Sequence, residues 1–174
     1  MSDSNPVTAI DDLDLDRYLG LWYEIARLPL RYEDAEASNV TAQYSLDDGS
    51  IRVDNRCLDA DGEPTQAVGR ATPAGDSPAQ LEVTFLPEGL RWIPFTKGDY
   101  WVLKLDADYQ HALVGTPDHK NLWLLARTPH VDAAVEQEFL TEAARQGFDL
   151  TDLIRPVQDG GRVTDEALAS SAES

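Results

Sequence analysis

Two side chains of this sequence could work as an acid–base pair. Glu24 lies in an early apolar run and His111 in a later one that also holds Leu113. A carboxylate and an imidazole are well suited to moving protons near neutral pH. The sequence contains no Gly-x-Ser-x-Gly motif, phosphate-binding loop or dinucleotide glycine fingerprint. Catalysis would therefore depend on this pair, and a structural role stays open for both residues.

The remaining reactive side chains have no partners at useful spacing. Cys57 is the single cysteine, so no disulfide forms within the chain, and we expect it to be a small buried side chain. His119 and His130 fall in connecting segments without metal-ligand spacing. The aspartates of residues 11–16 lack the glycine and final glutamate of an EF-hand loop. We expect no metal and no cofactor.

An aromatic residue near the start and an arginine much later form a second candidate pair. Gly20 and Trp22 stand two apart at the head of an apolar run, and Arg127 closes the last such run. In a closed barrel the first and last strands lie side by side. Trp22 and Arg127 would then meet, in a cation–π contact of about 0.5–2 kcal/mol.

Eight strand-like runs joined by short turns predict the elements that position these residues. Alternation of apolar and polar residues is clearest from Val40 to Leu46 and from Ile51 to Cys57. The runs span residues 20–28, 38–46, 51–57, 65–72, 81–85, 99–105, 109–115 and 121–127. Such a meander predicts an all-β fold, an eight-stranded up-and-down antiparallel β-barrel.

One helix follows the last strand. Thr128 is the expected cap, Pro129 suits the first turn, and Gly147 suits the end. An apolar stripe that includes Val135 and Phe139 predicts that this C-terminal helix packs outside the barrel. We expect a flexible N-terminus at 1–9, the barrel with its helix at 10–158, and a disordered tail at 159–174.

The barrel interior is the candidate binding site, because eight strands enclose room for one small ligand. Strand parity selects the expected cavity residues, and small side chains on the fourth strand would leave space. They are Glu24, Ala26, Val40, Ala42, Tyr44, Val53, Asn55, Ala67, Gly69, Phe85, Trp101, Leu103, His111 and Trp123. The alternative is that these side chains pack a solid core.

The charge is strongly acidic. The net charge is −18, from 32 acidic and 14 basic residues. The acids are 21 Asp to 11 Glu and the bases 11 Arg to 3 Lys. Nucleic acid and anionic membrane surfaces would be repelled. The choice of short carboxylates and few lysines indicates a halophilic protein, with an ordinary acidic protein as the alternative.

The N-terminal residues have neither a basic nor an apolar stretch typical of a signal peptide. No cysteine near the start could take a lipid anchor, and no apolar run is long enough to span a bilayer. We therefore expect a cytoplasmic protein without a stable membrane anchor. The sequence does not settle the oligomeric state.

Three short motifs, which follow one another along the chain, resemble those of the lipocalin family, in its bacterial outer-membrane and apolipoprotein D-like branch. Residues 20–27, Gly-Leu-Trp-Tyr-Glu-Ile-Ala-Arg, resemble the family's first region, with Gly20 and Trp22 as its structural residues. Asp99 and Tyr100 stand at the second region, where Gly98 replaces a threonine, and Arg127 resembles the third. The resemblance covers residues 10–158.

The resemblance implies a carrier of fatty acids, lysophospholipids or similar lipids, and not an enzyme. Retinoid, carotenoid and haem-like ligands stay open. The alternatives are an enzyme on a lipocalin-like barrel that acts on a hydrophobic substrate such as a polyene, and a structural or interaction protein whose interior is filled.

Overall fold

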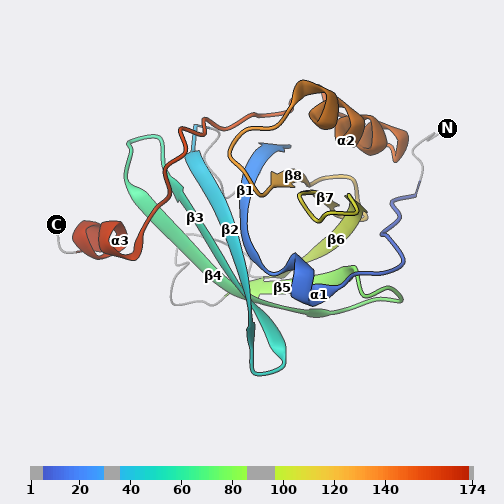
Figure 1. Cartoon of the computed structure of the whole chain (residues 1–174), viewed down its shortest axis with the longest axis horizontal. Coiled ribbons are helices and arrows are strands. Elements are labelled where there is room, and N and C mark those ends of the chain that lie inside the picture. The colour runs from blue at the N-terminus through green and yellow to red at the C-terminus, as the bar shows by residue number, and fades with distance from the viewer. Residues whose placement is uncertain (1–5, 30–35, 86–96, 173–174) are drawn as a thin grey trace.

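The computed structural model describes residues 6–29, 36–85 and 97–172. It confirms the predicted fold, a closed barrel whose strands follow one another in chain order (Figure 1). Each strand pairs antiparallel with the next, and β1 pairs with β8 to close the ring. The elements are α1 (Leu15–Tyr18), β1 (Gly20–Arg27), β2 (Ser38–Asp47), β3 (Ser50–Leu58), β4 (Pro64–Pro73), β5 (Gln80–Phe85), β6 (Lys97–Leu105), β7 (His111–Gly115), β8 (Leu122–Ala126), α2 (Ala133–Arg145) and α3 (Asp165–Ala172).

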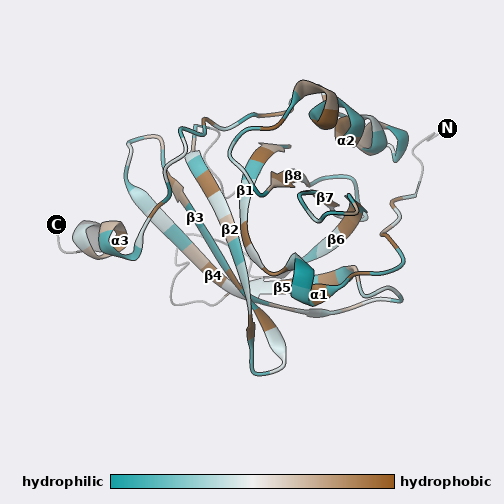
Figure 2. Cartoon of the chain, viewed as in Figure 1, coloured by the Kyte–Doolittle hydropathy of each residue, from teal (hydrophilic) through white to brown (hydrophobic). Residues whose placement is uncertain are grey.

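Alternating residues give β2 an inner and an outer face. Ala42 and Tyr44 belong to the inner core, while Gln43 is exposed between them. Figure 2 shows the resulting bands of hydrophobic and hydrophilic residues along β2, β3 and β4. The β2–β3 hairpin closes through Asp48 and Gly49, both with positive φ (50° and 86°). Two such residues form the turn that matches the twist of paired strands.

The C-terminal helix α2 covers the outer face of β7 and β8, as predicted (Figure 1). Phe139 and Ala143 pack there against Leu113 and Leu124 in a second hydrophobic cluster outside the barrel. This explains why β6, β7 and β8 are apolar on both faces.

The start of α2 differs from our expectation. Its N-cap is Asp132, and Thr128 instead donates a hydrogen bond from its hydroxyl to the carbonyl of His130 (2.9 Å). The helix thus begins one turn later than Thr128 and Pro129 indicated. Gly147 follows its end with a φ of 97°, the left-handed conformation that glycine adopts most easily.

The segment before β1 closes one end of the barrel. Leu13 and Tyr18 join the inner core, and the amide of Ile10 donates to the carbonyl of Val102 (2.9 Å). Val7 is buried against the outer cluster, although we expected residues 1–9 to be flexible.

Neither a membrane-spanning helix nor a cluster of metal-binding side chains occurs among the described residues. None of their helices is both long and apolar enough to cross a membrane. Within the same ranges, no three His, Cys, Asp or Glu side chains gather as a metal site would require. The irregular apolar connection that we expected at 87–97 lies, up to residue 96, outside the described residues.

Candidate binding site in the barrel

The closed end of the barrel is built on the predicted Trp22–Arg127 contact. Trp22 has no exposed surface, and the guanidinium carbon of Arg127 lies 3.7 Å from the centre of its indole ring. The indole Nε1 donates to the carbonyl of Tyr18 (2.8 Å). Gly20 has a φ of 106°, and a Cβ there would lie 3.4 Å from Arg127 Nη1. The first and third motif regions therefore meet as expected.

Arg127 also donates hydrogen bonds to four backbone carbonyls. Its Nε donates to the carbonyl of Tyr109 (3.0 Å), and Nη1 donates to that of Leu21 (3.0 Å). Its Nη2 donates to the carbonyls of Arg17 (2.7 Å) and Tyr18 (3.3 Å). Burial lowers the pKa of Arg127. The planar guanidinium of arginine presents its donors as a fork, a geometry that the ammonium of lysine lacks.

Three tyrosines fill the space above this end. Tyr18 and Tyr100 share a hydrogen bond between their hydroxyls (2.6 Å), and the Tyr100 hydroxyl donates to that of Tyr44 (2.8 Å). Burial raises the pKa of all three hydroxyls. The cavity left beside them measures about 10 Å³, roughly the room of one water molecule. Its lining comprises Leu15, Tyr18, Tyr44, Ile51, Val53, Ala71, Leu81, Val83 and Tyr100.

The opposite half of the interior is less filled. Asn55 and Ala67 face each other across β3 and β4 and are only half-buried, as are Phe85 on β5 and Trp123 on β8. Phe85 lies over Gly69, where an added Cβ would come within 2.9 Å of the ring. Phe85 and Trp123 nevertheless pack against the inner core with part of their surface.

Ten predicted cavity residues face the interior, judged from the strand registers and the inner core. They are Glu24, Val40, Ala42, Tyr44, Val53, Asn55, Ala67, Gly69, Phe85 and Trp123. Of the motif residues, Tyr100 faces inward, and Asp99 is exposed opposite Glu82 on the outer face.

Four predicted cavity residues lie on the outer face, which corrects our assignment. Ala26, Trp101 and Leu103 belong to or pack on the cluster beneath α2. The ring of His111 lies 5.8 Å from that of Phe139, and its Nδ1 lies 2.7 Å from Asp106 Oδ2. Burial opposes ionisation of Asp106, but the hydrogen bonds from the His111 ring and from the backbone amides of Gln110 and His111 together outweigh it, so the pKa of this carboxyl is lowered.

Arg27 also lies in the interior, although it was not among the predicted cavity residues. The β1–β8 register shifts between Glu24 and Ala26, which marks a β-bulge, so Ala26 turns outward and Arg27 turns inward opposite Trp123. The Arg27 side chain has no exposed surface, and its Nε lies 3.6 Å from Glu24 Oε2, whose side chain is 5% exposed. A buried ion pair therefore lies inside the barrel.

Gln158 was missed as well. Its side-chain amide donates to the carbonyls of Glu24 (2.8 Å) and Val40 (2.9 Å). These residues lie just beyond the last register pair of β1 and β2. Gln158 thus joins the two strands where their own ladder has ended, a contact that no local pattern could reveal.

A closed eight-stranded antiparallel barrel with an apolar interior defines a class of β-barrel that binds small ligands. The chain belongs to the lipocalin family, since the family model "Lipocalin-like domain" matches residues 13–158. The relatives support the bacterial and apolipoprotein D-like branch. Outer membrane lipoprotein Blc of Citrobacter freundii is 44% identical over 157 residues, 88% of this chain and 84% of that protein.

Two further matches agree. Apolipoprotein D of Bos taurus is 36% identical over 132 residues, 70% of this chain and 64% of that protein. The solved structure of apocrustacyanin C1 has a TM-score of 0.69 at 14% identity and covers 90% of this chain and 86% of its own, which supports the fold. Family membership supports a carrier role for a small hydrophobic ligand.

The cytoplasmic location that we expected is wrong by the same comparison. Several relatives, 38–44% identical, are named outer membrane lipoproteins. Their names support a membrane-associated or periplasmic location in place of the cytoplasmic one.

Proposed function

We propose that this protein carries one lipid with an acyl chain, such as a fatty acid or a lysophospholipid, in the half of the barrel away from Trp22. The observation that carries the proposal is the contrast between the two ends. One end is sealed by Trp22, Arg127 and the three tyrosines, while inward residues at the other end keep exposed surface. Apolar walls with few polar groups are typical of small-molecule sites.

The wall residues suit an acyl chain. Phe85 and Trp123 offer flat apolar surfaces, and the side chain of Ala67 on β4 is small. Each buried CH₂ group contributes about 0.8 kcal/mol, which over an acyl chain offsets the cost of association and gives micromolar binding.

The experiment compares two tryptophans on opposite sides of the barrel wall. In Trp123→Ala the affinity of the barrel for a fluorescent fatty acid should fall about ten-fold, because the indole faces the interior. The free energy of unfolding should change little. Trp101→Ala is the matched control and should lower stability while leaving binding intact, because its indole packs on the outer cluster. Equal binding loss in both variants, or no binding by the unaltered chain, contradicts the proposal.

We propose further that the barrel does not catalyse a reaction on its ligand. The one acid–base pair suggested by the sequence would be Glu24 with His111. Glu24 faces inward, whereas His111 lies on the outer face beside Phe139. With the sheet between them, the two groups cannot act on one substrate.

The place of action that fits best is the cell envelope. Relatives 43–44% identical are named outer membrane lipoproteins, which supports a membrane-associated or periplasmic location. The excess of acidic residues supports, in addition, a preference for high salt. A lipid carrier in the cell envelope is compatible with that preference.

A further inference from the structure

The hydrogen-bond ladder between β1 and β2 covers only part of β1. Its last register pair joins Tyr23 to Thr41, and the rest of β1, residues 24–27, pairs with β8 on its other side. Within the described residues, positions 38–40 of β2 likewise have no register partner on β1. The two strands therefore leave a seam in the barrel wall, in the half away from Trp22 where we place the ligand.

Residues 154–158, in the stretch between α2 and α3 (Figure 1), fill this seam. Towards β1, the amide of Ile154 donates to the carbonyl of Arg27 (2.8 Å), and the Arg27 amide donates to the Ile154 carbonyl (2.9 Å). Towards β2, the amide of Asn39 donates to the carbonyl of Val157 (2.8 Å). We call residues 154–158 the seam segment, because they lie between the two strands as a short extra strand would.

Alternating burial indicates that the seam segment is part of the barrel wall. Pro156 and Gln158 are buried, whereas Arg155 and Val157 are exposed. This alternation is that of a strand with one face toward an interior. The Gln158 side chain completes the closure, because its amide donates to one carbonyl on each strand (2.8 and 2.9 Å).

The seam segment is held less firmly than a strand of the barrel. Pro156 has no N–H to donate, and the two contacts at the Gln158 end depend on a single side chain. The Gln158 Oε1 is buried and finds no hydrogen-bond partner in the described part of the chain, which costs the desolvation of an acceptor. Gly160, with a φ of 93°, follows closely and lets the chain bend. Few hydrogen bonds, and a cost that water relieves, favour local opening of this segment.

We propose that the seam segment is a removable seal in the barrel wall, and that its detachment sets the rate at which the ligand enters and leaves. Detachment uncovers the interior beside Glu24 and Val40, whose carbonyls it holds. An acyl chain is long and narrow, so an open seam admits it sideways between β1 and β2. Lids of this kind limit the rate of exchange in many binding sites. This inference rests on the proposed carrier function and adds the route of exchange.

Stopped-flow exchange of a fluorescent fatty acid against excess laurate tests the seal. In Gln158→Ala both the association and the dissociation rate should rise about ten-fold, because two hydrogen bonds of the closed state are lost. The affinity should stay within about two-fold, since a seal changes both rates and leaves the bound state alone. Gln158→Asn retains an amide on a shorter side chain and should give an intermediate rise.

Gln66→Ala is the matched control. The Gln66 amide also donates two hydrogen bonds, to the carboxylate of Asp54 (3.1 and 3.2 Å), but it lies on the outer face of β4 and away from the seam. Its removal deletes the same chemical group and should leave both exchange rates unchanged. An equal rise of the rates in Gln66→Ala overturns the inference, because the effect would then follow from general loosening of the barrel.

Amide hydrogen exchange measures the opening itself. The amides of Ile154 and Asn39 report on the seam, and that of Leu28, which donates to the carbonyl of Leu122 (3.0 Å) across β1 and β8, reports on the intact wall. Gln158→Ala should accelerate the first two by the same factor as ligand dissociation and leave Leu28 unchanged. Ligand rates that stay constant while the seam amides exchange faster overturn the inference alone. A loss of affinity at a constant association rate does so too, whereas no binding by the unaltered chain overturns the carrier function as well.

Discussion

Arg127 stabilises the sealed end through its shape as well as its charge. Arg127→Met should lower the free energy of unfolding by about 3 kcal/mol, because the cation–π contact and hydrogen bonds to four carbonyls are lost together. Arg127→Lys retains the charge without the fork and should recover less than half of the loss. Urea unfolding measures both, and full recovery by lysine would show that charge alone matters.

The tyrosine cluster predicts an alkaline limit to stability. Burial raises the pKa of Tyr18, Tyr44 and Tyr100 above the ordinary value of 10, so the folded chain keeps protons that the unfolded chain releases above pH 10. The free energy of unfolding should therefore be unaffected by these groups below pH 10 and fall as the pH rises beyond it. Urea titrations between pH 8 and pH 11 measure this slope.

Tyr100→Phe is the matching substitution, because Tyr100 stands between the other two hydroxyls. Its loss should cost about 2 kcal/mol at pH 8, since two buried hydroxyls lose their partner, and should reduce the alkaline slope. Tyr23→Phe, on the outer face of β1, is the control and should change neither. An alkaline slope unaltered in Tyr100→Phe would contradict the role of the cluster.

At the level of single residues, parity predicted the interior well wherever one face of a strand is polar. Val53, Asn55 and Ala67 follow from simple alternation on β3 and β4. Ala26 and Arg27 could not be assigned, because the bulge in β1 reverses the parity and leaves no mark in the sequence.

At the level of elements, strands were predictable because turns and alternation punctuate them. Strands β6 and β7 were found, but their inner faces were not, because α2 covers the outside and both faces are apolar. Trp101, Leu103 and His111 were misplaced for this reason.

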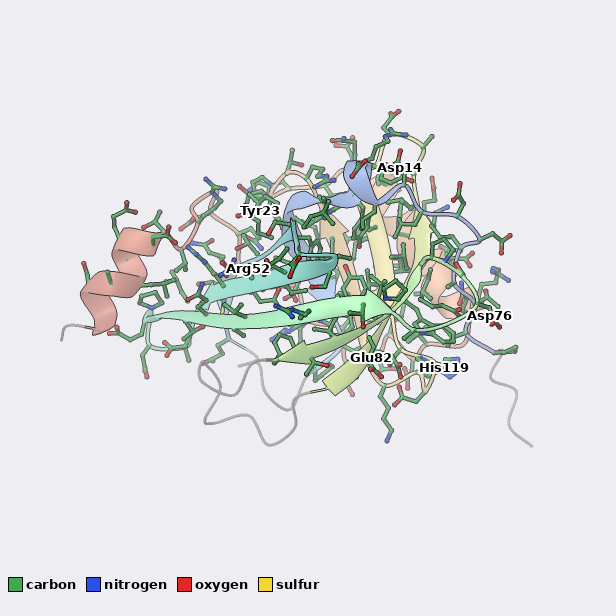
Figure 3. All side chains as sticks on the ribbon, turned by 90° about the horizontal axis from the view of Figure 1, so that it is seen from below. Asp14, Tyr23, Arg52, Asp76, Glu82 and His119 are labelled. Carbon is green, nitrogen blue, oxygen red and sulfur yellow. The ribbon has the colours of Figure 1, made fainter. Side chains whose placement is uncertain are left out.

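The last helix, α3, lies within residues 159–174, which we expected to form a disordered tail because they are small and polar. It lies at the side of the barrel away from Asp76 and His119 (Figure 3). The helix is held to the barrel by Arg56 on β3, which donates hydrogen bonds to the carbonyl of Val163 (3.1 Å) and to Asp165 (2.6 Å). The same guanidinium donates to Asp54. Burial opposes ionisation there, but the hydrogen bonds from Arg56 and Gln66 outweigh it and lower the pKa of Asp54.

Removal of this segment should have a modest cost. Ending the chain after Gln158 exposes Arg56 and removes Val163, which is 6% exposed, so we expect a loss of about 1–2 kcal/mol in urea unfolding. Asp165→Asn removes only an ion pair whose carboxylate is 84% exposed, and it should cost at most about 0.5 kcal/mol. If the substitution costs as much as the truncation, the ion pair and not the buried valine attaches the segment.

On the scale of the whole molecule, the barrel carries far more negative charge than its ion pairs neutralise. The net charge of −18 is spread over a chain with 14 basic residues, and several of these, such as Arg56, already have acidic partners. The unpaired carboxylates repel one another at low ionic strength, and this repulsion destabilises the compact state.

Raising the salt concentration should therefore stabilise the fold. At 1 M salt the screening length falls to about 3 Å, so repulsion between surface carboxylates is lost, while the buried Glu24–Arg27 pair is little affected. We expect Tm to rise by about 5 °C or more between 0.1 and 2 M KCl, which corresponds to roughly 2 kcal/mol for a chain of this size. Sucrose at equal osmolality is the control, because it stabilises by exclusion without screening charge. A flat or falling curve in KCl, or an equal rise in sucrose, would show that surface repulsion does not limit the stability of this barrel.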